Sequence, residues 1–138
     1  MTADEPSLTL LRSKVRDISD FPTPGILFKD ITPLLSDYHA MDTALSLLAQ
    51  AVEDLMFDII AAPEARGFVL AAPLARHFGV GLALIRKPGK LPAATLKHTY
   101  SLEYGNDTLE MHADSFEGMD SPRAVSYTHL TLPTILLV

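Results

Sequence analysis

Residues 58–86 read DIIAAPEARGFVLAAPLARHFGVGLALIR, and this stretch decides the fold class. Its first five residues are apolar after the aspartate and predict a short buried strand that ends at Pro63. Residues 68–78 predict a helix, with Gly79 as its C-cap. Residues 80–85 form a second apolar run that is again typical of a buried strand. A strand, a helix and a strand in about thirty residues predict two parallel strands with a right-handed crossover, hence an α/β fold.

Two more helices are expected upstream. Leu8, Leu11, Val15 and Ile18 recur at helical spacing and predict an amphipathic helix. Residues 21–25, FPTPG, end it, because two prolines and a glycine cannot continue a helix. The second helix has Asp37 as its candidate cap and an apolar face with helical periodicity, formed by Met41, Ala44, Leu45, Leu48, Val52, Leu55 and Met56.

The chain downstream of residue 85 predicts a loop and then a β-hairpin. Residues 86–97 contain two prolines and a glycine and are expected to form the loop. Tyr100, Leu102 and Tyr104 alternate with polar residues, and so do Leu109 and Met111. Residues 105–107, GND, supply turn residues between the two runs. We therefore expect a ribbon that stands off the sheet.

Composition excludes several classes of protein. The chain has 138 residues, the usual size of one domain, and 48% of them are hydrophobic. Its 11 Lys and Arg against 17 Asp and Glu give a net charge of −6, which argues against general affinity for nucleic acid or anionic membranes. It has no cysteine, so disulfides and thiol nucleophiles are excluded. Residues 1–7 lack the pattern of a signal peptide, and we expect a cytoplasmic protein.

Two cationic segments follow the predicted strands. Glu64-Ala65-Arg66-Gly67 lies between the first strand and the helix, where a helix start offers free backbone N–H groups to an anion. Residues 86–90, RKPGK, follow the second strand at the same edge of the sheet. Both suit a phosphate group. The alternatives are a surface arginine at a helix start and an ordinary solvated loop.

Glu103 lies at the tip of the predicted hairpin. A carboxylate there would act as a general acid or base if the ribbon closed over a ligand. The alternative is an exposed turn glutamate. The five histidines show no metal-ligand spacing, so we expect no metal site built from protein side chains.

Four ordered motifs resemble adenine phosphoribosyltransferases over roughly residues 8–120. They are residues 20–35 (DFPTPGILFKDITPLL), 64–68 (EARGF), 86–92 (RKPGKLP) and 100–105 (YSLEYG). The resemblance implies the type I phosphoribosyltransferase fold, a parallel sheet flanked by helices with a small hood and a β-ribbon, incomplete in this chain. It also implies that 5-phosphoribosyl 1-pyrophosphate, with Mg²⁺, and adenine give AMP and pyrophosphate. The intact protein would be a homodimer.

The resemblance also assigns roles to individual residues. Leu27, Phe28 and Lys29 would form the adenine pocket. Glu64 and Ala65 would form the pyrophosphate loop, often with a cis peptide bond between them, and Arg66 would bind pyrophosphate oxygens. Arg86, Lys87 and Lys90 would neutralise the leaving group. Glu103 would be the hood-loop acid, and Tyr104 would help to close the loop.

The last 18 residues differ from the rest. All 17 acidic residues and all seven glycines lie within residues 1–120. The family's segment after this point has a strand, two acidic residues and a Thr/Gly-rich loop that binds the 5′-phosphate. We therefore divide the chain into residues 1–120, the N-terminal part of a phosphoribosyltransferase domain, and a non-family tail, 121–138. The tail resembles translated sequencing-adapter read-through; the alternative is a natural divergent C-terminus.

Two functions remain open from the sequence. The first is adenine phosphoribosyltransferase activity of the intact protein, with residues 1–138 themselves inactive and poorly stable. The second is a non-catalytic module on the same fold that senses a purine or phosphoribosyl pyrophosphate. A regulator of that kind would normally carry a DNA-binding domain, for which residues 1–20 are too short.

Overall fold

The computed structural model describes residues 4–102 and 105–126. The chain divides into two compact units, with the boundary between Leu55 and Met56. The described residues of the first unit are 4–55, and those of the second are 56–102 and 105–126. Within these ranges, no helix has both the length and the apolar character needed to cross a membrane.

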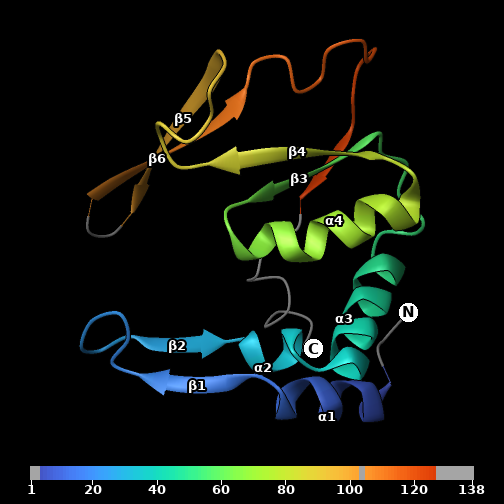
Figure 1. Cartoon of the computed structure of the whole chain (residues 1–138), viewed down its shortest axis with the longest axis vertical. Helices are drawn as coiled ribbons and strands as arrows, with labels where there is room; N and C mark the ends of the chain where they lie inside the picture. The colour runs from blue at the N-terminus through green and yellow to red at the C-terminus, as the bar shows by residue number, and fades with distance from the viewer. Residues whose placement is uncertain (1–3, 103–104, 127–138) are drawn as a thin grey trace. The chain divides into compact units, whose positions relative to one another are not determined.

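The first unit packs two helices against a third beside a small ribbon. Helices α1 and α2 both contact α3, and the core contains Leu11, Leu34 and Leu48, all fully buried. The ribbon is antiparallel, with Ile18 opposite Phe28. The elements are α1 (Glu5–Ser13), β1 (Arg16–Ser19), β2 (Leu27–Asp30), α2 (Thr32–Leu35) and α3 (Tyr38–Gln50) (Figure 1).

The first predicted helix is shorter in the structure. It ends at Ser13, and Ile18 lies in β1 instead of in a fourth helical turn. Pairing with β2 explains the difference, because Ile18 lies opposite Phe28 and β-branched side chains favour extended backbone. The helical spacing of Val15 and Ile18 was therefore misleading.

Helix α3 begins as predicted and ends early. The side chain of Asp37 accepts a hydrogen bond from the backbone N–H of Ala40 at 3.1 Å, which confirms the N-cap. The helix ends at Gln50, so Val52, Leu55 and Met56 lie outside it. Leu55 and Met56 are 55% and 74% exposed, which contradicts their predicted place on the core face. Residues 51–54 form turns with hydrogen bonds from Val52 N–H to the Ala49 carbonyl and from Leu55 N–H to the Val52 carbonyl, so the helical pattern does not continue toward β3.

The second unit is a five-stranded sheet with one helix. Its strand order is β5-β6-β4-β3-β7, and β3 pairs in parallel with β4 from Ile59↔Gly81 to Pro63↔Ile85. The helix α4 packs against both of these strands, which confirms the predicted strand–helix–strand unit. The elements are β3 (Ile59–Pro63), α4 (Arg66–Phe78), β4 (Gly81–Arg86), β5 (Thr95–Leu102), β6 (Gly105–His112) and β7 (Ala124–Ser126) (Figure 1).

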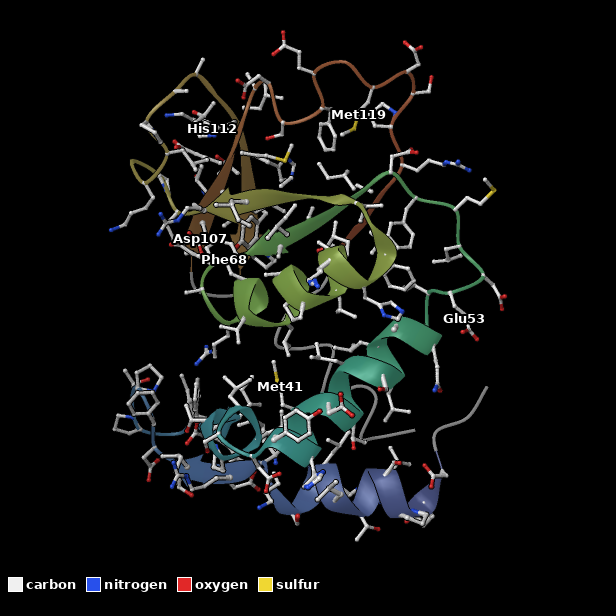
Figure 2. The ribbon with its side chains drawn as sticks, turned by 45° about the vertical axis from the view of Figure 1, so that its right-hand side comes forward. Met41, Glu53, Phe68, Asp107, His112 and Met119 are labelled. Atoms are coloured by element: carbon white, nitrogen blue, oxygen red, sulfur yellow. The ribbon has the colours of Figure 1, made fainter. Side chains whose placement is uncertain are left out.

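Burial on two sides holds this sheet together. Helix α4 buries Leu70 and Leu74. It ends at Gly79, which has the left-handed φ of 67° that favours glycine at a helix C-terminus, as predicted. A separate cluster of Ile59, Ala61 and Ala83 packs against residues that follow the ribbon, including Phe116 and Met119. Figure 2 labels Met119.

The hairpin forms, but its turn and its position differ from the prediction. Strands β5 and β6 pair from Thr95↔His112 to Leu102↔Gly105, so residues 105–107 begin β6 instead of forming the turn. The ribbon is also part of the sheet, because β6 pairs with β4 at Ile85↔Met111 and Arg86↔Glu110. The pairing of β6 with β5 and with β4 therefore overrides the turn preference of Gly105-Asn106-Asp107.

Strand β7 lies inside the segment that was predicted not to belong to the family. Residues Ala124, Val125 and Ser126 pair in parallel with the other edge of β3. The backbone N–H of Arg123 donates to the carboxylate of Asp58 at 2.9 Å, and the Asp58 N–H donates to the Arg123 carbonyl at 2.8 Å. The sheet thus has a third parallel strand, which sequence reasoning did not predict because a three-residue strand leaves almost no pattern.

Candidate anion-binding site at the sheet edge

The two predicted cationic segments lie side by side. Pro63 is opposite Ile85 at the ends of β3 and β4, so both segments leave the sheet at its carboxyl edge. The backbone N–H of Glu64 donates to the carbonyl of Ile85 at 2.9 Å and continues this pairing by one residue. We call residues 86–90 the cationic loop. The predicted convergence of the two segments is confirmed.

Arg66 is the first residue of α4. The N-cap position before it is Ala65, which has no side-chain acceptor for the first N–H groups of the helix. Those groups and the positive end of the helix dipole favour a bound anion. The peptide bond between Glu64 and Ala65 is cis, as the resemblance implied.

An ion pair joins the two segments directly. The Nε of Arg86 donates to Oε2 of Glu64 at 2.7 Å, and the two side chains are 32% and 17% exposed. This hydrogen bond from the guanidinium is the main reason why the pKa of Glu64 is lower than usual. The guanidinium also lies 5.9 Å from the centre of the Phe68 ring. Arg86 is therefore held by its own chain, and its charge is partly neutralised.

Lys87 also has an acidic partner. Its ammonium group forms an ion pair with Oδ2 of Asp107 on β6. Lys90 differs, because no ion pair or hydrogen bond within the described residues engages its ammonium group, and its side chain is exposed. Its charge still helps to lower the pKa of Glu64. Of the three cations in the loop, Lys90 is the one most available to a ligand.

A buried carboxylate also holds the cationic loop in place. Glu110 on β6 is 4% exposed, and its Oε2 accepts a hydrogen bond from the backbone N–H of Gly89 at 3.3 Å. Its Oε1 lies 3.0 Å from Nζ of Lys97. Sequence reasoning missed both Asp107 and Glu110. In the sequence, Glu110 alternates with Leu109 and Met111 and looks like an ordinary polar residue of a strand. Only the pairing of β6 with β4 brings it to the cationic loop.

The predicted adenine-pocket residues lie in the first unit. Leu27 is 54% exposed, and Phe28 packs its ring edge-on against Phe21 with centroids 5.1 Å apart. Lys29 forms an ion pair with Asp17 at 2.6 Å. Glu103 and Tyr104 lie outside the described residues. The structure therefore brings together the predicted diphosphate-binding residues, Glu64, Ala65, Arg66, Arg86, Lys87 and Lys90.

A resident metal site is not found in the part of the chain that the structure describes. No group of three or more His, Asp or Glu side chains there could hold a metal ion.

Comparison with known proteins identifies the fold. A crystal structure of adenine phosphoribosyltransferase from Thermoanaerobacter pseudethanolicus matches with a TM-score of 0.81 and 51% identity, over 86% of this chain and 68% of that one. The enzyme from Giardia lamblia, complexed with 9-deazaadenine, matches with a TM-score of 0.78 and 29% identity, over 91% of this chain and 66% of that one. No family model matches. The fold is that of the type I phosphoribosyltransferases.

The curated relatives narrow the class further. A protein from Thermoanaerobacter sp. (strain X514) named adenine phosphoribosyltransferase is 54% identical over 109 residues, which are 79% of this chain. The chain belongs to the adenine phosphoribosyltransferase family. It spans 63% of the length of that relative.

Proposed function

We propose that the intact protein transfers the 5-phosphoribosyl group from phosphoribosyl pyrophosphate to adenine and releases AMP and pyrophosphate, a reaction of purine salvage. The observation that carries this proposal is the meeting of Glu64–Arg66 with the cationic loop at one sheet edge, held by the Arg86–Glu64 ion pair. Family membership and the adenine analogue in the Giardia lamblia structure support the choice of base. Cytoplasmic location and a homodimer are part of the same proposal.

The cationic edge suits the charge that the reaction develops. Breaking the bond between ribose and pyrophosphate builds negative charge on the leaving group and positive charge on the sugar. Arg66, at the start of α4, and Lys87 and Lys90 would offer positive charge to the leaving diphosphate. Arg86 would orient the cationic loop through its ion pair with Glu64. The part of its positive charge that Glu64 does not neutralise would also act on the diphosphate.

Adenine recognition and acid catalysis are assigned to other parts of the chain. Leu27, Phe28 and Lys29 would form the adenine pocket, with Phe28 against the ring. Glu103 would donate a hydrogen bond to, or accept one from, the imidazole nitrogen of the purine, and Tyr104 would help to close the hood. A carboxylate in that position is a suitable general acid or base.

Magnesium would enter as part of the substrate. Mg²⁺ commonly binds through substrate phosphates, a few waters and one or two carboxylates. The diphosphate oxygens and water would supply ligands to the ion.

Residues 1–138 are not expected to catalyse the reaction by themselves. Residues 121–138 contain no acidic residue and no glycine, and so offer no counterpart of the loop that binds the 5′-phosphate in this family. We propose that the chain carries the diphosphate-binding and adenine-binding part of the site. We also propose that the family portion reaches Ser126, since β7 completes one edge of β3.

An extended chain tests the activity. It joins residues 1–126 to the corresponding C-terminal part of the Thermoanaerobacter sp. relative. We expect it to form AMP from adenine and phosphoribosyl pyrophosphate with Mg²⁺, whereas residues 1–138 form none. Arg66→Ala in the extended chain should chiefly raise the KM for phosphoribosyl pyrophosphate.

Two outcomes would contradict the proposal. A folded extended chain that uses another base in place of adenine would refute the substrate assignment. Tight purine binding in calorimetry without turnover by a cooperatively folded extended chain would favour the sensing module instead.

A further inference from the structure

Asp107 occupies a position that the proposed reaction does not use. It lies on β6, where Figure 2 labels it, and it pairs with Tyr100 of β5. Its Oδ2 accepts a hydrogen bond from the Tyr100 hydroxyl at 3.1 Å and also forms the ion pair with Nζ of Lys87. Its Oδ1 accepts from the backbone N–H of Thr108 at 2.9 Å. One carboxylate therefore links the β5–β6 ribbon to the cationic loop.

The charges in this group depend on one another. The hydrogen bond from Lys87 lowers the pKa of Asp107, and the same contact raises the pKa of Lys87. The Lys87 and Asp107 side chains are 46% and 29% exposed, so an anion from solvent can reach the ammonium group. Any such anion meets a lysine that already has a negatively charged partner.

The ribbon does not need this ion pair to stay in place. Strands β5 and β6 are held by eight residue pairs in register, from Thr95↔His112 to Leu102↔Gly105. The base of β6 pairs with β4, and buried Glu110 holds the loop through Gly89. Exposed ion pairs add little to stability. A structural role therefore accounts poorly for the convergence of three donors on Asp107.

We propose that Asp107 is a positioning residue that holds Lys87 against the ribbon and competes with the diphosphate for its ammonium group. This inference rests on the proposed function, which supplies the diphosphate. Anion binding at Lys87 releases Asp107 from the loop and leaves it bound to Tyr100 and Thr108. The ribbon that leads to Glu103 and Tyr104 is thereby uncoupled from the cationic loop when the diphosphate binds.

Calorimetric titration of residues 1–138 with Mg²⁺-pyrophosphate tests the competition. Asp107→Asn keeps acceptor atoms for Tyr100 and Thr108 and removes the charge. We expect it to raise the affinity about two- to fivefold, the range that follows from the strength of exposed ion pairs. Asp114→Asn is the matched control, because it removes an equal charge from an exposed residue of the same unit and should leave the affinity unchanged.

A second variant and a double-mutant cycle separate competition from general effects. Asp107→Ser gives the same readout if the Asn variant lacks a cooperative melt. In a Lys87→Met background, the gain from removing the Asp107 charge should disappear, because the two residues act on one contact. A gain that persists without Lys87 would overturn the proposal, and so would an unchanged or lower affinity in both Asp107 variants.

Acylation of lysines, followed by mass spectrometry, tests the ion pair without any ligand. Lys87 should react faster in the Asp107 variants, relative to the exposed Lys90 in the same chain. An unchanged ratio would overturn the proposal. A different result would contradict the proposed function. In that case neither the parent chain nor the Arg66→Ala variant binds pyrophosphate, while Lys87 still reacts faster in the Asp107 variants than in the parent chain. The competition then fails with it, although the ion pair itself is real.

Discussion

Arg86 and Glu64 join the ends of two parallel strands through a hydrogen bond of 2.7 Å between Nε and Oε2. Glu64 follows β3, and Arg86 is the last residue of β4, so the pair closes the sheet at the edge where ligands bind in folds of this class. This ion pair fixes the direction in which the cationic loop leaves the sheet. It also partly neutralises the positive charge of the loop.

Glu64→Ala should therefore lower the free energy of unfolding by about 1 kcal/mol, because a half-buried guanidinium loses its charged acceptor. Glu64→Gln should lose less, since its amide oxygen still accepts from Arg86. Urea unfolding measures both. Asp17→Ala is the control, because it breaks an ion pair of 2.6 Å whose side chains are 46% and 55% exposed, and it should change stability little. Equal losses at the two sites would contradict a special role for Glu64.

Acid should weaken the first unit through Asp30. The backbone N–H of Thr32, first, and Arg16, second, lower the pKa of Asp30 from 3.8 to about 2. Because the folded-state pKa is depressed, its contribution to stability is present above pH 3.8 and is lost as the pH falls toward 2. Asp30→Asn should be less stable than the parent at neutral pH and should approach it in acid. Urea midpoints across that range measure this.

Exposed Asp42 on α3 provides the control for Asp30, because its side chain forms no ion pair or hydrogen bond within the described residues. Asp42→Asn should follow the pH dependence of the parent. If Asp30→Asn also follows the parent curve, the hydrogen bonds of Asp30 do not contribute as described.

Gly79→Ala should lower the free energy of unfolding by about 1 kcal/mol. The cost comes from the backbone alone, because φ is +67° and no atom lies within 4 Å of an added Cβ. Gly81→Ala is the matched control in the same connection. Its added Cβ would lie 3.8 Å from Cγ1 of Ile59, an ordinary contact, and no strained φ is involved. A larger loss at Gly81 in chemical denaturation would refute the argument.

Residues 1–126 should be more stable than residues 1–120. The six additional residues contain β7 and Arg123, whose carbonyl accepts from the Asp58 N–H and whose N–H donates to the Asp58 carboxylate. Without them, one edge of the buried strand β3 loses its pairing, and unpaired buried backbone groups are costly. Thermal melts of the two chains measure the difference. Identical melting temperatures would place the end of the family portion at residue 120, as the composition first suggested.

Glu103→Gln in the extended chain should lower kcat and kcat/KM together, by about 10²–10⁴-fold. A carboxylate that meets the purine only when the hood closes acts mainly in the transition state. Steady-state kinetics with adenine as the varied substrate measure both constants. An unchanged kcat would make Glu103 an ordinary turn residue.

Sequence patterns predicted the elements that are long or locally capped. The unit of β3, α4 and β4 follows from two apolar runs, a helical pattern and Gly79, and the start of α3 follows from Asp37. The errors lie where pairing between distant segments overrides local preference. Ile18 joined a strand because β2 lies beside it, and Gly105 entered β6 because the register with β5 continues to that residue.

The same limit applies to the candidate site. Arg66 and the cationic loop could be found from the sequence because charges directly follow predicted strands. The carboxylates of Asp107 and Glu110 could not, because only the β4–β6 and β5–β6 registers bring them to the loop.

The pairing of β7 with β3 has a consequence for the order of folding during synthesis. Asp58 and Arg123 are 65 positions apart in the chain, so β3 waits for its second neighbour until all the intervening residues have been made. Contacts between such distant residues form slowly, since a long loop must close first. Until then, one edge of an apolar strand is open to pairing with other nascent chains. Chaperone capture of ribosome-bound chains should therefore decline sharply once residue 126 has left the exit tunnel.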